Sequence, residues 1–157
     1  ETFVTRKITR AVGRIQLGIQ SKLTLGNLEA SRDWGFAGDY MEGAWKMMQF
    51  ETPEDWVLAT GETHKVSEFA ELAFKEVGLE WSDYVETSER YLRPNEVNYL
   101  LGDPSKAKKK LGWQSTTSFS DLVKMMVESD IELAKQEEIL MKNNLIKPTW
   151  ENPISKN

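Results

Sequence analysis

The sequence predicts an α/β protein. Stretches with apolar residues at helical spacing alternate with short apolar runs that are typical of strands. The strands are too few to build a doubly wound sheet of their own. The chain also begins at Glu1, without methionine, and a helical pattern starts almost at once. Together these observations predict an α/β portion of a larger protein.

The predicted helices follow from apolar residues that recur every three or four positions. They cover residues 4–17, a stretch that Asp39 would cap, residues 66–77, a short stretch from Asp103-Pro104 to Leu111-Gly112, and a final stretch that begins at Ser118. Thr2 or Thr5 would cap the first helix. Asp130 interrupts the apolar stripe of the final helix, so we expect that helix to leave the core there. The expected organisation is a body of residues 1–135 and a polar tail of residues 136–157.

The predicted strands are Lys22–Leu25 and Trp56–Ala59. The second is an apolar run closed by Thr60-Gly61, and it is too short for a helix, which favours a buried strand. The sheet that would bury such a strand is not contained in the chain. We therefore expect apolar residues of Val4–Ile15 or Trp56–Ala59 to be partly exposed or covered by another copy, which leaves room for a homo-oligomer.

The composition excludes several classes of function. No cysteine is present, and the single histidine, His64, cannot build a zinc site alone, so we expect no metal site. A net charge of -5 argues against nucleic-acid binding. No apolar run approaches the roughly 18 residues of a membrane span, and the polar first residues do not resemble a signal peptide. We expect a cytoplasmic protein that binds neither nucleic acid nor membrane.

Motifs for dinucleotide binding and oxidoreduction are missing. The ten glycines never occur as G-x-G, which a dinucleotide-binding turn needs for close approach to pyrophosphate. No P-loop exists, and no tyrosine is followed four residues later by lysine. His64 has no nucleophile motif around it, so no catalytic triad can be built. We therefore expect neither catalytic nor cofactor-binding residues in this chain.

Several strings of residues together resemble one enzyme family. They are residues 1–9 (Glu-Thr-Phe-Val-Thr-Arg-Lys-Ile-Thr), Leu25-Gly26-Asn27-Leu28 with Arg32-Asp33-Trp34-Gly35, Ala59-Thr60-Gly61-Glu62-Thr63-His64, Tyr91-Leu92-Arg93-Pro94-Asn95-Glu96-Val97 with Leu101-Gly102-Asp103-Pro104, and Lys110-Leu111-Gly112-Trp113. In this order they resemble the second half of GDP-mannose 4,6-dehydratases, within the extended short-chain dehydrogenase/reductase family. The resemblance runs from Glu1 to about Asp130.

The resemblance implies both a fold and a reaction. The fold would be the C-terminal, substrate-binding portion of an extended short-chain dehydrogenase/reductase, lacking most of the Rossmann sheet. The family converts GDP-mannose to GDP-4-keto-6-deoxymannose, with bound NADP taking a hydride from the sugar and returning it. The catalytic residues and the NADP site would lie upstream of Glu1. This chain would then bind GDP-mannose or GDP and be inactive alone.

The residues that match the family's ligand contacts are Lys7, Leu25, Asn27, Arg32, Arg93 and Glu96. The resemblance implies that Arg32 and Arg93 reach the diphosphate, whose oxygens a guanidinium fork matches well. Leu25 and Asn27 would edge the guanine, the first as an apolar wall and the second as a polar reader. Lys7 would face the nucleotide. Glu96 would accept from sugar hydroxyls or hold Arg93.

Each of these residues also has a purely structural interpretation. Arg32 would form a surface ion pair with Asp33, and Arg93 a pair with Glu96. Asn27 would serve the turn that follows Gly26. Lys7 would be solvated surface.

Aromatic residues and departures from the family pattern complete the expectations. Trp34, Trp45 and Trp113 are expected in the core, and His64 in a strand-to-helix turn. Phe36 stands where the family usually has histidine, and Ser88-Glu89-Arg90 replaces a more usual Asp-Pro-Arg.

Two other functions stay open. One is a binding or assembly module that kept the fold and lost the ligand. The other is a fragment of a UDP-sugar epimerase or dehydratase. The Leu-Gly-Asn loop followed by Arg32-Asp33-Trp34-Gly35 favours the GDP-mannose family over UDP-sugar enzymes.

Overall fold

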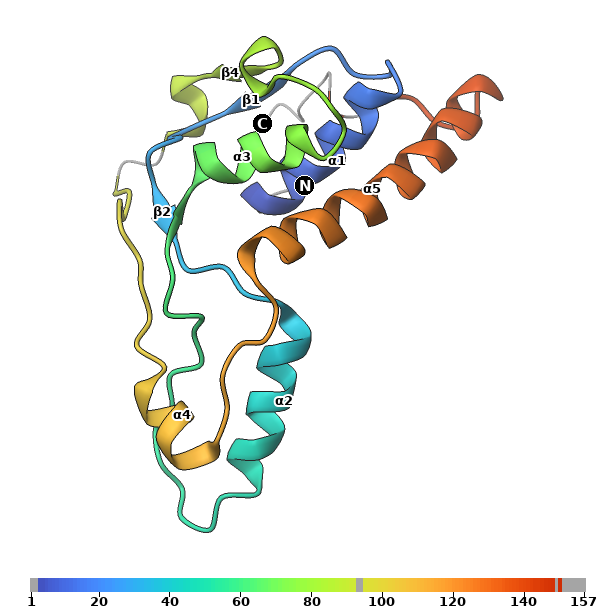
Figure 1. Ribbon diagram of the computed structural model, residues 1–157. Coiled ribbons are helices and arrows are strands. Elements are labelled where there is room, and N and C mark those ends of the chain that lie inside the picture. Colours follow the sequence, from blue (N-terminus) through green and yellow to red (C-terminus); the bar gives the residue numbers. More distant parts are fainter. Residues whose placement is uncertain (1–2, 93–94, 149, 151–157) are drawn as a thin grey trace.

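The computed structural model describes residues 3–92, 95–148 and 150, and shows the α/β fold that the sequence predicts. The upper part in Figure 1 contains α1 (Val4–Gln16), α3 (Val66–Lys75) and α5 (Phe119–Lys142), with strands β1 (Leu23–Leu25) and β4 (Val85–Thr87) beside them. The lower part contains α2 (Ala37–Met48) and α4 (Ser105–Leu111). Extended segments join the two parts.

The first helix forms where its apolar spacing predicts it. Its N-cap is Phe3, which makes no side-chain capping bond, so the expected threonine cap is wrong. Ile8 and Val12 are completely buried, because α3 and α5 cover the apolar face of α1. Of the two segments in which the sequence predicts exposed apolar residues, this one is therefore covered within the chain.

The last helix does not leave the core at Asp130. This residue is 0% exposed and accepts a hydrogen bond from the Thr9 hydroxyl at 2.6 Å, while Arg6 pairs with it at 3.0 Å. One turn further, Ala134 is also buried, and α5 runs unbroken past residue 135 to Lys142. The carboxylate can be buried because arginines of α1 neutralise it, and their side of α1 therefore faces α5.

Two small sheets connect the elements. β1 and β4 are parallel, with Leu23 opposite Val85 and Leu25 opposite Thr87. β2 (Ser31–Arg32) pairs antiparallel with β3 (His64–Lys65), which leads directly into α3. Two 3₁₀ turns flank β4, at Trp81–Asp83 and Glu89–Tyr91. No helix among the described residues is long and apolar enough to cross a membrane.

The lower part differs most from expectation. Residues 53–60 are extended but form no strand, so the predicted strand Trp56–Ala59 is wrong. No described segment pairs with them as a neighbouring strand. Val57 is 51% exposed, as expected for an apolar segment whose partner sheet is not in the chain. Trp45 is 61% exposed rather than in the core, and it shares one face of α2 with the exposed Met41 and Met48.

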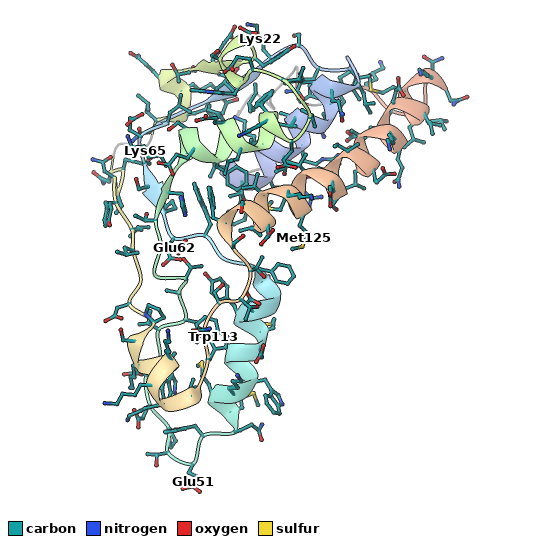
Figure 2. The ribbon with its side chains drawn as sticks, viewed as in Figure 1. Lys22, Glu51, Glu62, Lys65, Trp113 and Met125 are labelled. Carbon is teal, nitrogen blue, oxygen red and sulfur yellow. The ribbon has the colours of Figure 1, made fainter. Side chains whose placement is uncertain are left out.

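The other two tryptophans are placed as expected. Trp113 is almost completely buried between α2 and the segment that carries α4 (Figure 2). Its indole N–H donates to the carbonyl of Asp39 at 2.8 Å. Trp34 packs edge-on against Phe69 at the border of the upper core.

Asp39 joins α2 to the segment that precedes α5. It lies in the first turn and is not the cap, which is Phe36. Its carboxylate accepts from the N–H groups of Thr116 and Thr117 and from the hydroxyls of Ser115 and Thr116, at 2.9–3.0 Å. Burial opposes ionisation of this carboxyl, but the four hydrogen bonds outweigh it and lower its pKa to about 2.

This lowered pKa predicts a pH-dependent contribution to stability. A carboxyl with a folded pKa below its unfolded value stabilises the fold above about pH 4, and that stabilisation is lost as pH falls toward about 2. We expect Asp39→Asn to lower the free energy of unfolding by about 1–2 kcal/mol at pH 7, and the difference from wild type to shrink between pH 4 and 2. Urea denaturation across this range measures it. Asp55→Asn, on the exposed loop, is the control, and a pH-independent difference for Asp39→Asn contradicts the prediction.

Candidate functional site

Arg32 and Glu96 form the centre of the candidate site. Arg32 lies on β2, and its Nη2 donates to Glu96 Oε1 at 2.5 Å. Its Nη1 donates to the carbonyls of Ser31 and Val97, at 2.8 and 2.6 Å, which fixes the plane of the guanidinium. Both charged side chains stay about one-fifth exposed, at 21% and 19%. The pair is therefore ordered yet accessible to a ligand.

Asp33 is not the partner of Arg32, so that alternative is wrong. Its Oδ1 accepts from the N–H and the hydroxyl of Thr60, at 2.9 and 2.6 Å. Its Oδ2 accepts from the N–H groups of Gly61 and Gly102, at 3.1 and 3.2 Å. Burial raises the pKa of this carboxyl, but these bonds, led by the Thr60 hydroxyl, lower it more. Asp33 thus ties three separate segments together, directly beside Arg32.

Glycine is required where Gly102 meets this carboxylate. A Cβ on Gly102 would lie 2.2 Å from the Cβ of Ala59, which no side chain could tolerate. The N–H of Gly102 can therefore reach Asp33 because the residue has no side chain. The segment that follows Glu96 is held against the site by this approach.

Lys7 and Leu25 are both found at β1. The Lys7 ammonium donates to the carbonyl of Thr24 at 2.6 Å and lies 3.6 Å from the centre of the Tyr91 ring. It is therefore held in place and is not simply solvated surface. Leu25 ends β1, within the predicted strand Lys22–Leu25, and it is 2% exposed in the core cluster. In this structure its side chain offers almost no surface to a ligand.

Asn27 connects the two sides. Its side-chain carbonyl accepts from the N–H of Glu29 at 2.9 Å, which is the turn role considered from the sequence. Its amide also donates to Asn98 at 3.4 Å. Residues 96–98 thus touch both Arg32 and Asn27, and they bring these two predicted residues together with Glu96. Arg93, the remaining predicted residue, lies outside the described residues.

His64 packs as a structural residue. It pairs with Arg32 in the β2–β3 ladder and lies shortly before α3. This is the strand-to-helix turn in which the sequence places it. Its ring stacks on Phe119 at 3.8 Å, and its Nδ1 lies 3.1 Å from Glu68. A polar hollow of about 150 Å³ adjoins it, bordered by Trp34 and the residues before α5. This hollow is separate from the Arg32–Glu96 pair.

The described residues contain no cluster of metal ligands. No group of three or more acidic or histidine side chains among them is placed so that it could hold a metal ion. The glycine-rich turn that a pyrophosphate needs is absent from the sequence, as is the Tyr-x-x-x-Lys pair. The site can therefore bind an anion through Arg32 and accept hydrogen bonds from hydroxyl groups through Glu96.

The sequence reasoning missed two contributors to this site. The first is Asp33, which was treated as a salt-bridge partner although it lies inside the Arg32-Asp33-Trp34-Gly35 string. The second is Tyr91, whose ring lies beneath Lys7. No local pattern distinguishes either role, because each depends on segments far apart in the chain.

Several solved structures share this fold. RMD from Pseudomonas aeruginosa, complexed with NADPH, superposes with a TM-score of 0.75 at 18% identity, over 83% of this chain and 43% of that chain. UDP-glucose 4-epimerase from Bifidobacterium longum, in complex with NAD+ and UDP, superposes with a TM-score of 0.63 at 20% identity, over 88% and 40%. The chain therefore has the fold of a portion of these proteins, about 40% of their length, and its described residues contain two small two-stranded sheets.

Sequence comparison specifies the family. The model of the family GDP-mannose 4,6 dehydratase matches residues 1–126. GDP-mannose 4,6 dehydratase 1 of Arabidopsis thaliana is 60% identical over 140 residues, which is 89% of this chain and 39% of the relative. The human GDP-mannose 4,6 dehydratase is 44% identical over 150 residues, 85% of this chain and 40% of the relative. The chain belongs to the GDP-mannose 4,6-dehydratase family and spans about 40% of the length of these relatives.

The role of Asp33 can be tested by Asp33→Asn. The amide nitrogen cannot accept a hydrogen bond, so at least one of the four donors loses its partner, at a cost of about 1–3 kcal/mol. We expect hydrogen exchange at Thr60, Gly61 and Gly102 to accelerate, as measured by NMR. Asp103→Asn is the matched control, because the asparagine carbonyl oxygen can still accept from the N–H of Ser105 in its own turn. Unchanged exchange at Thr60 and Gly61 in Asp33→Asn would show that the carboxylate is not the link.

Proposed function

We propose that this chain is the sugar-nucleotide-binding portion of a GDP-mannose 4,6-dehydratase and binds GDP-mannose or GDP. The observation that carries the proposal is the ordered, accessible Arg32–Glu96 pair in a chain of this family. Arg32, with Arg93, holds the diphosphate. Lys7 and Asn27 line the approach on either side of β1, and Leu25 supports the strand from the core.

The geometry of Arg32 explains how the pair would work. Two backbone carbonyls hold Nη1, so the guanidinium keeps its orientation when Nη2 changes partner. A diphosphate that approaches Nη2 displaces the Glu96 carboxylate, because two anions repel each other and compete for the same donor. Glu96 is then free to accept hydrogen bonds from sugar hydroxyls. Binding would therefore place the phosphates and the sugar hydroxyls on adjacent groups.

The chemical step is assigned to the rest of the enzyme. In the whole protein GDP-mannose becomes GDP-4-keto-6-deoxymannose with NADP, and this chain lacks both the Tyr-x-x-x-Lys pair and a dinucleotide turn. Its own residues bind and orient the substrate. A cytoplasmic location is part of the same proposal.

Two alternatives compete with this function. The exposed stripe of Met41, Trp45 and Met48 on α2 favours a binding or assembly module, because large apolar patches mark interfaces. A UDP-sugar enzyme is less consistent with the chain, since the UDP-glucose 4-epimerase from Bifidobacterium longum is 20% identical and a GDP-mannose 4,6 dehydratase is 60% identical. Nucleotide binding distinguishes all three.

The purified chain should produce no GDP-4-keto-6-deoxymannose from GDP-mannose and NADP, because it lacks the residues that transfer hydride. Mass spectrometry of the nucleotide sugars after prolonged incubation measures this. A full-length relative serves as the positive control. Product formed by the chain alone contradicts the assignment of chemistry to the missing portion.

Arg32→Ala should weaken GDP and GDP-mannose binding roughly ten- to a hundredfold, the value of one charge-assisted contact. Arg32→Lys should recover part of the loss, because a point charge cannot reproduce a two-pronged contact. Arg93→Ala should show a similar loss. Calorimetry with GDP, GDP-mannose and UDP-glucose measures these affinities.

The matched control is Lys65→Gln, which removes a cation from β3 that pairs with Glu29 on the surface. This variant should bind like wild type. Equal affinity of wild type for all three ligands, or an unchanged Arg32→Ala, would favour the assembly module.

A further inference from the structure

We propose that Asp130, on α5, is a positioning residue for nucleotide binding. Its carboxylate fixes the rotation of α1 and thereby holds the Lys7 ammonium where it meets the ligand. This inference rests on the proposed function, in which Lys7 lines the approach of the nucleotide. Asp130 is 0% exposed, so it cannot touch a ligand itself and acts only through α1.

Three side chains of α1 hold the buried carboxylate. The Thr9 hydroxyl donates to its Oδ2 at 2.6 Å, Arg6 pairs with its Oδ1 at 3.0 Å, and Arg10 approaches the same oxygen to 3.8 Å. Thr9 is also completely buried, and its hydroxyl reaches carbonyls of its own helix only at 3.2 and 3.4 Å. A buried carboxylate that loses such partners is costly, so this face of α1 is fixed toward α5.

The backbones of the two helices also meet at Asp130. α5 runs beside α1 (Figure 1), and a Cβ on Gly13 would lie 2.9 Å from the carbonyl oxygen of Asp130. No side chain fits in that space, so backbone packs on backbone there. Contact through both the carboxylate and the backbone of one residue leaves α1 little freedom to turn about its axis or to slide along it.

The place of Lys7 depends on this rotation. The residues that bind Asp130 lie on both sides of Lys7 in the sequence. Successive residues of an α-helix point about 100° apart, so Lys7 points to the side when Arg6 faces α5. There its ammonium donates to the carbonyl of Thr24 at 2.6 Å and lies 3.6 Å from the centre of the Tyr91 ring. A partial turn of α1 would carry the ammonium away from both groups.

The first measurement needs no ligand. The face of the Tyr91 ring should shield the protons beside the Lys7 ammonium, so that they resonate upfield in the NMR spectrum of the wild-type chain. Lys7→Met identifies the signal by removing it. Asp130→Asn keeps the shape of the side chain and removes its charge. In this variant the signal should move toward the value of an exposed lysine, because α1 is no longer held at one rotation.

The second measurement is a double-mutant cycle for GDP affinity, followed by calorimetry. Lys7→Met should weaken GDP binding about tenfold, the value of one charge-assisted contact, and Asp130→Asn should weaken it by no more than that factor. The double variant should bind like Lys7→Met, because Asp130 acts through Lys7. Additive losses would show that Asp130 serves only the stability of the fold, and they would overturn the inference.

Glu137→Gln is the matched control. Glu137 also lies on α5 and pairs with arginines of α1, Arg10 and Arg14, about two turns further along. This variant should keep both the Lys7 signal and the GDP affinity of wild type. A shift of the Lys7 signal as large as that of Asp130→Asn would mean that any weakening of the α1–α5 contact moves Lys7, and the specific role of Asp130 would be wrong.

Thr9→Val is a milder second variant, because it removes one hydrogen bond to the carboxylate and keeps the shape of a buried side chain. It should shift the Lys7 signal in the same direction as Asp130→Asn, and by less. If Asp130→Asn does not fold, Thr9→Val decides the question by the same two measurements, with its own double variant with Lys7→Met.

The two measurements separate this inference from the proposed function. An unchanged Lys7 signal in Asp130→Asn and Thr9→Val overturns the inference, whatever the affinity for GDP. If the signal moves as expected but the wild-type chain binds no GDP, Asp130 does position Lys7, and the role in binding is wrong together with the proposed function. If Lys7→Met binds GDP like wild type while Arg32→Ala does not, the proposed function stands and the inference is wrong.

Discussion

The carboxylate of Asp33 is the link on which the candidate site depends. Three segments meet at this carboxylate: the segment after β2, the turn at Thr60-Gly61 and the segment after Glu96. Little sheet structure connects them, namely the short β2–β3 ladder and a bridge between Ser31 and Tyr99. Extended chain without sheet partners loses much conformational entropy when it is ordered. Four hydrogen bonds to one carboxylate offset that cost at a single point. Arg32 precedes this point directly, so the same bonds hold the backbone from which its guanidinium extends.

Local periodicity was enough to predict the helices, but it did not predict which residues their charged side chains contact. The spacing of Ile8 and Val12 places α1 correctly, since a helix face depends on neighbours three and four residues away. Asp130 was taken as the end of the buried stripe because a lone carboxylate is costly to bury. Its partners, Arg6 and Thr9, lie more than a hundred residues away, and no local pattern reveals them. The predicted strand Trp56–Ala59 is wrong for a related reason. A strand needs a neighbouring strand to pair with, and apolar content alone does not supply one.

The candidate site was predictable to the extent that the family resemblance covers it. Arg32, Glu96 and Asn27 meet through residues 96–98, and Lys7 is fixed nearby at Thr24. Leu25 ends β1, as the predicted strand Lys22–Leu25 allows, but its side chain lies in the core and not at the guanine edge that the resemblance implies.

The Arg32–Glu96 pair also constrains where binding energy can arise. The guanidinium is already paired before any ligand arrives, so a phosphate reaches Nη2 only by releasing the Glu96 carboxylate. The released carboxylate then needs new donors, and sugar hydroxyls can supply them. On this reasoning the arginine on β2 holds the phosphates, while the displaced carboxylate contributes to selectivity for the sugar.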